Sequence, residues 1–222
     1  MLLYFAVLNI FLSPLFLLIS PLVLSFGTLS DVGRISFVSG LGVFLGGLTM
    51  TAWGGPRRGR MRAVLWCTLA LAAFCLVTGL RADLVTIGIG AFGMSLWVTL
   101  LNGIYATIVQ VKVPQRFHGR VFALNTLIAW STLPLGFGLV APYGAAVFDP
   151  LLAPGGALAP TLGALIGTGA GRGVGLMYLM FGLAMAVLAA VALRSRLPGL
   201  LDRSTDATPD DLVGLQALGR TL

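Results

Sequence analysis

Two apolar stretches of the chain carry uncharged polar residues at intervals that place them on one face of a helix. These residues are Asn9, Ser13 and Ser20 in the first stretch and Ser95, Thr99 and Asn102 in the fourth. At 100° per residue, the first three fall within about 40° of one another and the second three within about 60°. Such stripes either form hydrogen bonds between helices or line an aqueous cavity, and spacing alone leaves both interpretations open.

Motifs for catalysis or metal binding are absent from the sequence. It has no H-E-x-x-H, no G-x-S-x-G and no paired carboxylates, and its one histidine, His118, lies in a basic loop without a second ligand. The segment GTGAGRG at 167–173 resembles a phosphate-binding glycine loop but lacks the Lys-Ser/Thr pair and follows no strand, so we interpret it as a flexible lead into the last helix. Cys67 and Cys75 are about 12 Å apart along one helix, too far for a disulfide. We therefore expect no enzyme activity, cofactor or metal.

The composition is that of an integral membrane protein. The chain has 222 residues, of which 58% are hydrophobic and 9% are charged, and its mean hydropathy is +1.00. Soluble domains carry about a quarter charged residues. The net charge of +7 comes from short basic islands between apolar runs, a pattern that argues against a nucleic-acid partner.

Six apolar segments are long enough, at about 20 residues, to cross a hydrocarbon core of about 30 Å. They span about 2–26, 35–53, 63–80, 84–109, 121–145 and 174–193. Prolines interrupt the first and the fifth, which membrane helices tolerate where neighbours satisfy the freed carbonyls. No acid falls inside a segment, which argues against a proton relay in this stretch. The predicted fold is an all-α membrane protein, a bundle of six transmembrane helices in residues 1–196 with a mobile cytoplasmic tail at 197–222.

Basic residues alternate between the two ends of the predicted helices. The first, third and fifth loops hold three, Arg34, Arg81 and Arg172. The second and fourth loops and the tail hold eleven: Arg57, Arg58, Arg60, Arg62, Lys112, Arg116, Arg120, Arg194, Arg196, Arg203 and Arg220. Because Lys and Arg favour the cytoplasmic side, we expect these two loops and both termini in the cytoplasm. The expected location is a cell membrane, such as a bacterial plasma membrane, crossed several times.

Two of the basic loops carry the residues on which a family resemblance rests. In GGLTMTAWGGPRRGRM they are Gly47, Gly54, Gly55, Arg57, Arg58 and Arg60, and in QVKVPQRFHGRVFALN they are Pro114, Gly119 and Arg120. With the helix order, these residues make the chain resemble the C-terminal six-helix half of a major facilitator superfamily transporter, of the multidrug and siderophore exporter branch. The resemblance covers about residues 1–196. The family's signature Asp is missing, and Thr51 stands about where it falls.

The resemblance implies a cavity between two six-helix bundles, lined by the first and fourth helices of each half. Asn9, Ser13, Ser95, Thr99 and Asn102 are therefore expected to line a substrate cavity. The implied activity is export, by alternating access, of an amphiphilic organic compound such as a drug, a siderophore or a peptide natural product. The transporter would be a proton antiporter whose coupling acids lie in the missing half.

The expected partners are the lipid bilayer, the small organic substrate, and either an N-terminal half-transporter or a second copy of the chain. The first apolar run begins at Met1 with no basic residue before it and no signal-peptide cleavage site. This pattern is typical of a chain that begins midway through a larger membrane protein, and a short natural protein is the alternative. The competing function is a non-transporting scaffold or permease-like subunit that binds a cytoplasmic partner through its basic loops.

Overall fold

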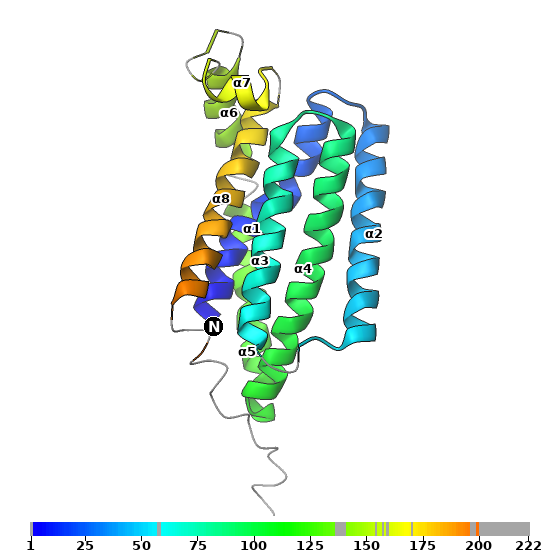
Figure 1. The fold of residues 1–222 in the computed structure, drawn as a ribbon, viewed down its shortest axis with the longest axis vertical. Coiled ribbons are helices and arrows are strands. Elements are labelled where there is room, and N and C mark those ends of the chain that lie inside the picture. Colours follow the sequence, from blue (N-terminus) through cyan, green and yellow to red (C-terminus); the bar gives the residue numbers. More distant parts are fainter. Residues whose placement is uncertain are drawn as a thin grey trace, which may run out of the picture.

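The chain folds into helices in every regular part that the structure describes (Figure 1). The computed structural model describes residues 2–56, 59–135, 141–153, 155–156, 158, 160–169, 171–195 and 199. The helices are α1 (Leu2–Leu24), α2 (Leu29–Trp53), α3 (Arg60–Leu80), α4 (Leu84–Lys112), α5 (Gln115–Leu135), α6 (Ala141–Leu152), α7 (Leu162–Ile166) and α8 (Arg172–Arg194).

Five of the described helices, α1, α2, α3, α4 and α8, are long and apolar enough to cross a membrane. The expected helix at 121–145 overlaps two of the described helices. There α5 ends at Leu135, α6 begins at Ala141, and residues 136–140 lie outside the described part. Pro134 falls in the last turn of α5 and Pro142 in the first turn of α6.

The start of α2 also differs from the prediction, because the helix begins at Leu29 and not near residue 35. The carboxylate of Asp31 accepts hydrogen bonds from the backbone N–H of Thr28 at 2.9 Å and from its hydroxyl at 2.8 Å. These bonds satisfy groups that a helix start leaves unpaired. Asp31 therefore lies inside a helix, and so does Asp149 in α6, although both fall outside the predicted apolar segments. Both acids lie near helix ends.

The core forms where α3 packs between α4 and α8, while α2 packs on α4 and α1 packs on α8 and α5. Hydrogen bonds join α1 to this core: the Tyr178 hydroxyl donates to the Leu15 carbonyl, and the Tyr4 hydroxyl donates to Thr68 Oγ1 at 2.8 Å. Such bonds between helices are worth about 0.6–2 kcal/mol each inside a membrane. They fix α1 against α8 and α3, and so position the polar face of α1.

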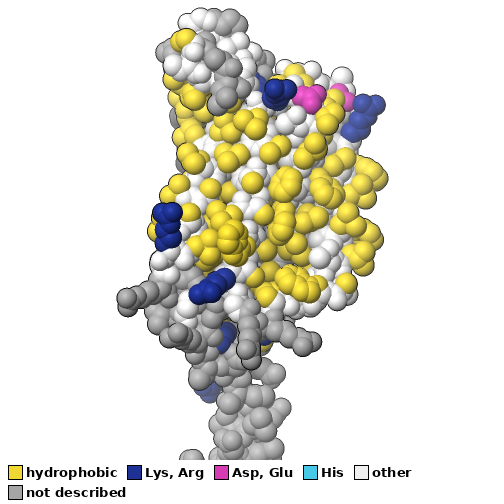
Figure 2. Space-filling model, in the orientation of Figure 1, with side chains coloured by type: hydrophobic (Ala, Val, Ile, Leu, Met, Phe, Trp, Pro, Cys, Tyr) yellow, Lys and Arg dark blue, Asp and Glu magenta, His cyan; other side chains and the backbone are white. Residues whose placement is uncertain are grey.

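The two ends of the bundle differ in charge. Figure 1 shows the start of α1, the end of α8 and the α2–α3 and α4–α5 connections at one end. Among the described residues, this basic end carries Arg60, Arg62, Lys112, Arg116, Arg120 and Arg194 and no acid. The opposite, mixed-charge end carries Arg34, Arg81, Arg172, Asp31, Asp83 and Asp149. In Figure 2 hydrophobic side chains cover the middle of the visible face, and charges lie at its margins, as expected for a bundle that crosses a bilayer.

Candidate functional site

The polar residues of α1 lie on a flank that the other described helices leave partly open. Asn9 and Ser13 are half-buried, and Ser20 is exposed. The exposed side chain of Ile10 marks the same side of α1. Asn9 Nδ2 donates a hydrogen bond of 2.8 Å to the Phe5 carbonyl one turn earlier. The Asn9 amide is thus held along its own helix rather than bound to a neighbouring one.

Two of the three polar residues of α4 lie against α2. Ser95 is 1% exposed, and a Cβ added to Gly42 of α2 would lie 3.1 Å from the Ser95 Cβ. A Cβ added to Gly46 would lie 2.9 Å from the Thr99 Cβ. The Thr99 hydroxyl donates to the Ser95 carbonyl at 2.8 Å. Small residues at four-residue spacing allow this close approach. Ser95 and Thr99 therefore pack between two helices, which is the first of the two interpretations of the stripe.

Asn102, the third polar residue of α4, is exposed. No hydrogen bond joins its side chain to another residue in the part of the chain that the structure describes. It lies ten residues, or about 15 Å, from the basic end of α4, and Asn9 lies about 10 Å from the basic end of α1. The two amides are thus at similar depth on neighbouring helices.

A ring contact joins α1 to α4 between these amides and the basic end. The ring centroids of Phe5 and Tyr105 are 3.7 Å apart. Asn9 follows Phe5 by one turn, and Asn102 precedes Tyr105 by about one turn, so both lie farther from the basic end than the contact. The five residues predicted to line a cavity therefore divide into Asn9, Ser13 and Asn102 on open flanks and two hydroxyls packed on α2, and their role in binding stays a prediction.

Tyr105 is a polar residue that the sequence reasoning missed. Its side chain is 3% exposed, and its hydroxyl is buried without a hydrogen-bond partner among the described residues. An unpaired buried hydroxyl costs about 1–3 kcal/mol. The signal in the sequence is a tyrosine three residues after Asn102 in an otherwise aliphatic segment.

The connection between α2 and α3 begins with two glycines. Gly54 and Gly55 have φ of 69° and 78°, in the left-handed region that favours glycine. The Gly54 N–H caps α2 by donating to the Met50 carbonyl at 2.8 Å, and Arg60 begins α3. Gly47 lies inside α2 with nothing within 4 Å of an added Cβ. Arg57 and Arg58 lie outside the described residues.

The fourth predicted loop is mostly helix. Pro114 separates α4 from α5, whereas Gly119 and Arg120 lie inside α5, which begins at Gln115. The expectation of a loop there is wrong because a single proline at the helix start leaves the following residues free to form helical hydrogen bonds. His118, expected in the loop, is also in α5, with Nε2 2.8 Å from the Val113 carbonyl oxygen.

Side chains suited to redox or metal chemistry are not gathered in the described part of the chain. Cys67 and Cys75 are free and buried, and no group of three or more His, Cys, Asp or Glu residues there is placed to hold a metal ion. What the polar faces of α1 and α4 offer is hydrogen bonding without acid–base chemistry.

Comparisons of the chain with models of protein families, with curated proteins and with solved structures found no match.

Proposed function

We propose that the chain is one half of a secondary active transporter that exports an amphiphilic organic compound through a cavity to which α1 and α4 contribute. The observation that carries the proposal is the exposed amide of Asn102, at the depth of Asn9, in a bundle with five helices of membrane length. Moving an amide from water into hydrocarbon without a partner costs about 2–7 kcal/mol. A water-filled cavity, or polar groups on another half, removes that cost.

The uncovered side of α2 supports the need for a partner. Phe37 is 69% exposed and Phe44 is 65% exposed. Gly40 and Gly47 are also open, with nothing within 4 Å of an added Cβ. Small residues among large apolar ones let another transmembrane helix approach closely. The partner in the proposal is an N-terminal half-transporter or a second copy of this chain, placed so that the faces of α1 and α4 look onto the shared cavity.

The position of the acids indicates how such a transporter would be coupled. Within the described helices, Asp31 and Asp149 lie near helix ends and no acid lies near the middle of a span. Mid-membrane acids are the usual proton-binding groups of transporters. Proton antiport in the proposal therefore relies on acids of the other half, while this half supplies amide and hydroxyl groups that bind substrate. The basic end faces the cytoplasm, as its charge requires.

Replacing Asn102 by leucine tests the proposal. We expect Asn102→Leu to reduce export of an amphiphilic fluorescent probe at least tenfold per folded molecule in vesicles that contain the complete transporter, with the melting temperature unchanged or raised. Thr99→Val is the matched control, because Thr99 lies in the contact with α2 and its loss should affect stability more than export. A large loss of stability with normal export per folded Asn102→Leu protein would refute the cavity assignment.

One observation favours a second function, the binding of a cytoplasmic partner through the basic end. That end carries six basic residues and no acid among those described. The same charge is what the positive-inside rule requires of a multi-pass protein, so transport is the first proposal. If docking is the function, Arg116→Gln with Arg120→Gln should release a partner that co-purifies from native membranes and leave probe export unchanged.

A further inference from the structure

A buried arginine lies at the mixed-charge end, away from the faces of α1 and α4. Arg172 is the first residue of α8 and is 3% exposed. Its Nη1 donates to the Ile166 carbonyl at 2.5 Å, whereas Nε and Nη2 are buried without a hydrogen-bond partner in the described chain. An arginine side chain keeps its charge in proteins. The bundle therefore holds a cation with one edge of its guanidinium unpaired.

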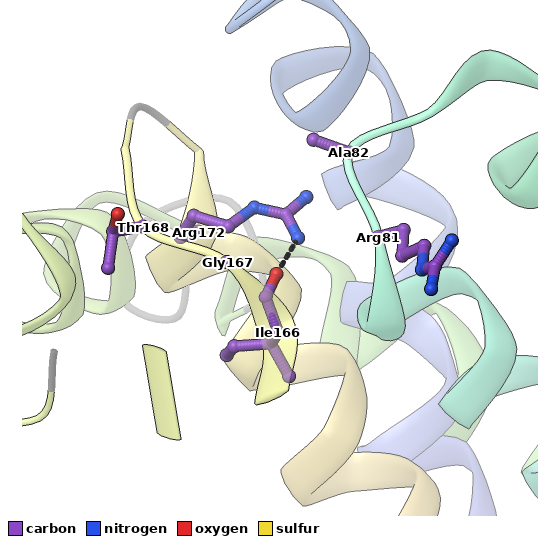
Figure 3. Close-up of a pocket in the computed structure, with 6 residues that line it drawn as sticks. All are labelled: Arg81, Ala82, Ile166, Gly167, Thr168 and Arg172. Atoms are coloured by element: carbon purple, nitrogen blue, oxygen red, sulfur yellow. Dashed lines mark hydrogen bonds between the residues drawn. The ribbon is translucent and has the colours of Figure 1, made fainter. Parts of the chain in front are cut away.

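A small pocket opens beside this guanidinium and has a volume of about 280 Å³. Its lining residues are Arg81, Ala82, Ile166, Gly167, Thr168 and Arg172. Figure 3 shows the Arg172 guanidinium between the α7–α8 segment on one side and the α3–α4 connection on the other. Pockets for drug-sized ligands begin at about 300 Å³, so this pocket suits a single charged group.

Two of the three acids at this end are engaged away from the pocket, and the third caps α8. Asp31 pairs with the arginine one turn along α2 at 3.1 Å, and Asp83 accepts from the first turn of α4 at 3.1 Å. Asp149 accepts from the backbone N–H that follows Arg172, at 2.8 Å. Among the described residues, no acid forms an ion pair with Arg172 or Arg81. The Asp149 carboxylate offsets the positive end of the α8 dipole, so the positive charge at the pocket is that of Arg172 and Arg81.

Close packing of α8 on α3 holds the guanidinium in place. A Cβ added to Gly79 of α3 would lie 2.6 Å from the Gly175 carbonyl oxygen of α8. A Cβ on Gly175 would lie 3.8 Å from Arg172 Cζ, and one on Gly167 would lie 3.7 Å from Arg172 Cδ. The side chain is thus confined on two sides by backbone, and its unpaired edge is fixed before any ligand arrives. Donors fixed in advance lose less entropy on binding.

We propose that this pocket binds a phosphate group. Nε and Nη2 lie on one edge of the guanidinium and can donate side by side to two phosphate oxygens. The exposed Arg81 at the mouth of the pocket balances the remaining negative charge of the phosphate. Each nitrogen has less than 1 Å² exposed, so the lining of the pocket must shift slightly before a phosphate oxygen reaches them. The pocket lies at the end of the membrane-length helices, at the depth of lipid headgroups. The phosphate therefore comes either from an anionic lipid or from solution.

Binding to the purified chain in detergent tests the proposal and separates the two sources. Native mass spectrometry counts bound phosphatidylglycerol, with phosphatidylcholine as the neutral lipid, and the melting temperature is followed with inorganic phosphate alone. We expect Arg172→Gln to weaken binding about tenfold or more, which corresponds to about 1.4 kcal/mol. Arg34→Gln removes the same charge at the same end outside the pocket and should change binding little. If phosphatidylglycerol stays bound when inorganic phosphate is added, the phosphate group comes from the lipid. If inorganic phosphate raises the melting temperature and displaces phosphatidylglycerol, the ligand is the free anion.

A second variant keeps the test decisive if Arg172→Gln does not fold. Thr168→Trp fills the pocket while Arg172 and its bond to Ile166 stay in place, so it should fold and lose binding. Arg172→Lys should bind at an intermediate level, because it keeps the charge and loses the two-donor edge. The proposal is overturned if wild-type protein binds neither probe, or if Thr168→Trp binds as well as Arg34→Gln does.

Discussion

Two neighbouring glycines of α2 allow the contact between α2 and α4 to be tested with a matched pair of substitutions. A methyl group on Gly46 would lie 2.9 Å from the Leu96 carbonyl oxygen and 2.9 Å from the Thr99 Cβ. A methyl group on Gly47 would meet nothing within 4 Å. Both residues lie inside the same helix, so alanine brings about the same gain in helix propensity at each, roughly 1 kcal/mol. The difference between the two variants isolates the helix contact.

The magnitude follows from the two short distances. Real Cβ atoms essentially never approach another atom to under 3.0 Å, so α2 must move away from α4 in Gly46→Ala. Forcing an extra carbon into a packed interface costs about 1–3 kcal/mol. We expect Gly46→Ala to be less stable than Gly47→Ala by that amount. For a chain of this size the difference corresponds to about 2–12 °C in melting temperature.

The assay is reversible unfolding in detergent micelles, followed by tryptophan fluorescence. Helix content by circular dichroism before unfolding serves as the control that both variants fold. If the two variants have the same free energy of unfolding within about 0.5 kcal/mol, α2 does not pack on α4 as described, and the assignment of Ser95 and Thr99 to the helix contact fails with it.

Three further predictions concern the hydrogen bonds, the orientation and the helix cap. Tyr178→Phe should cost about 0.6–1.7 kcal/mol because it removes a hydrogen bond between α8 and α1. Tyr105→Phe should be neutral or stabilising, because its hydroxyl has no partner among the described residues. Equal losses of stability in thermal melts would contradict these hydrogen bonds. With both native cysteines replaced by alanine, cysteine at Arg62 should resist an impermeant thiol reagent added to intact cells and cysteine at Ala82 should react, and the reverse result would invert the orientation. Asp31→Ala should cost about 0.5–2 kcal/mol and increase amide hydrogen exchange in the first turn of α2, and unchanged exchange there would show that the carboxylate does not hold the helix start.

Apolar run length predicted most of the helices, because a span needs about 20 apolar residues and these runs are continuous. The start of α2 was missed because Asp31 looks like a loop residue in sequence, yet its carboxylate caps the helix. The segment after Pro114 was missed for a similar reason: Arg116 and His118 are polar, but α5 includes them. Polar residues at helix ends are read as loops when only hydropathy is considered.

The site was less predictable than the fold. Helical spacing placed Ser95 and Asn102 on one stripe, but a stripe about 60° wide can face both a neighbouring helix and an open flank. Only packing against Gly42 shows that Ser95 faces α2. The sequence predicted Arg172 to be one of three basic residues in the first, third and fifth loops. Nothing in its local sequence reveals that α3 and α7 bury it. Burial of this kind depends on contacts between residues far apart in sequence.

Water accessibility at Asn102 tests the central claim most directly. In native membranes containing the chain without its own cysteines, Asn102→Cys would be treated with a small, charged, water-soluble thiol reagent, and Phe37→Cys on the outer face of α2 would be the control. Labelling requires a thiolate, which forms in water and not in hydrocarbon. We predict that Asn102→Cys is labelled and Phe37→Cys is not, because Asn102 lines an aqueous cavity. If Asn102→Cys reacts no faster than Phe37→Cys, that face does not meet water, and the transporter account is contradicted.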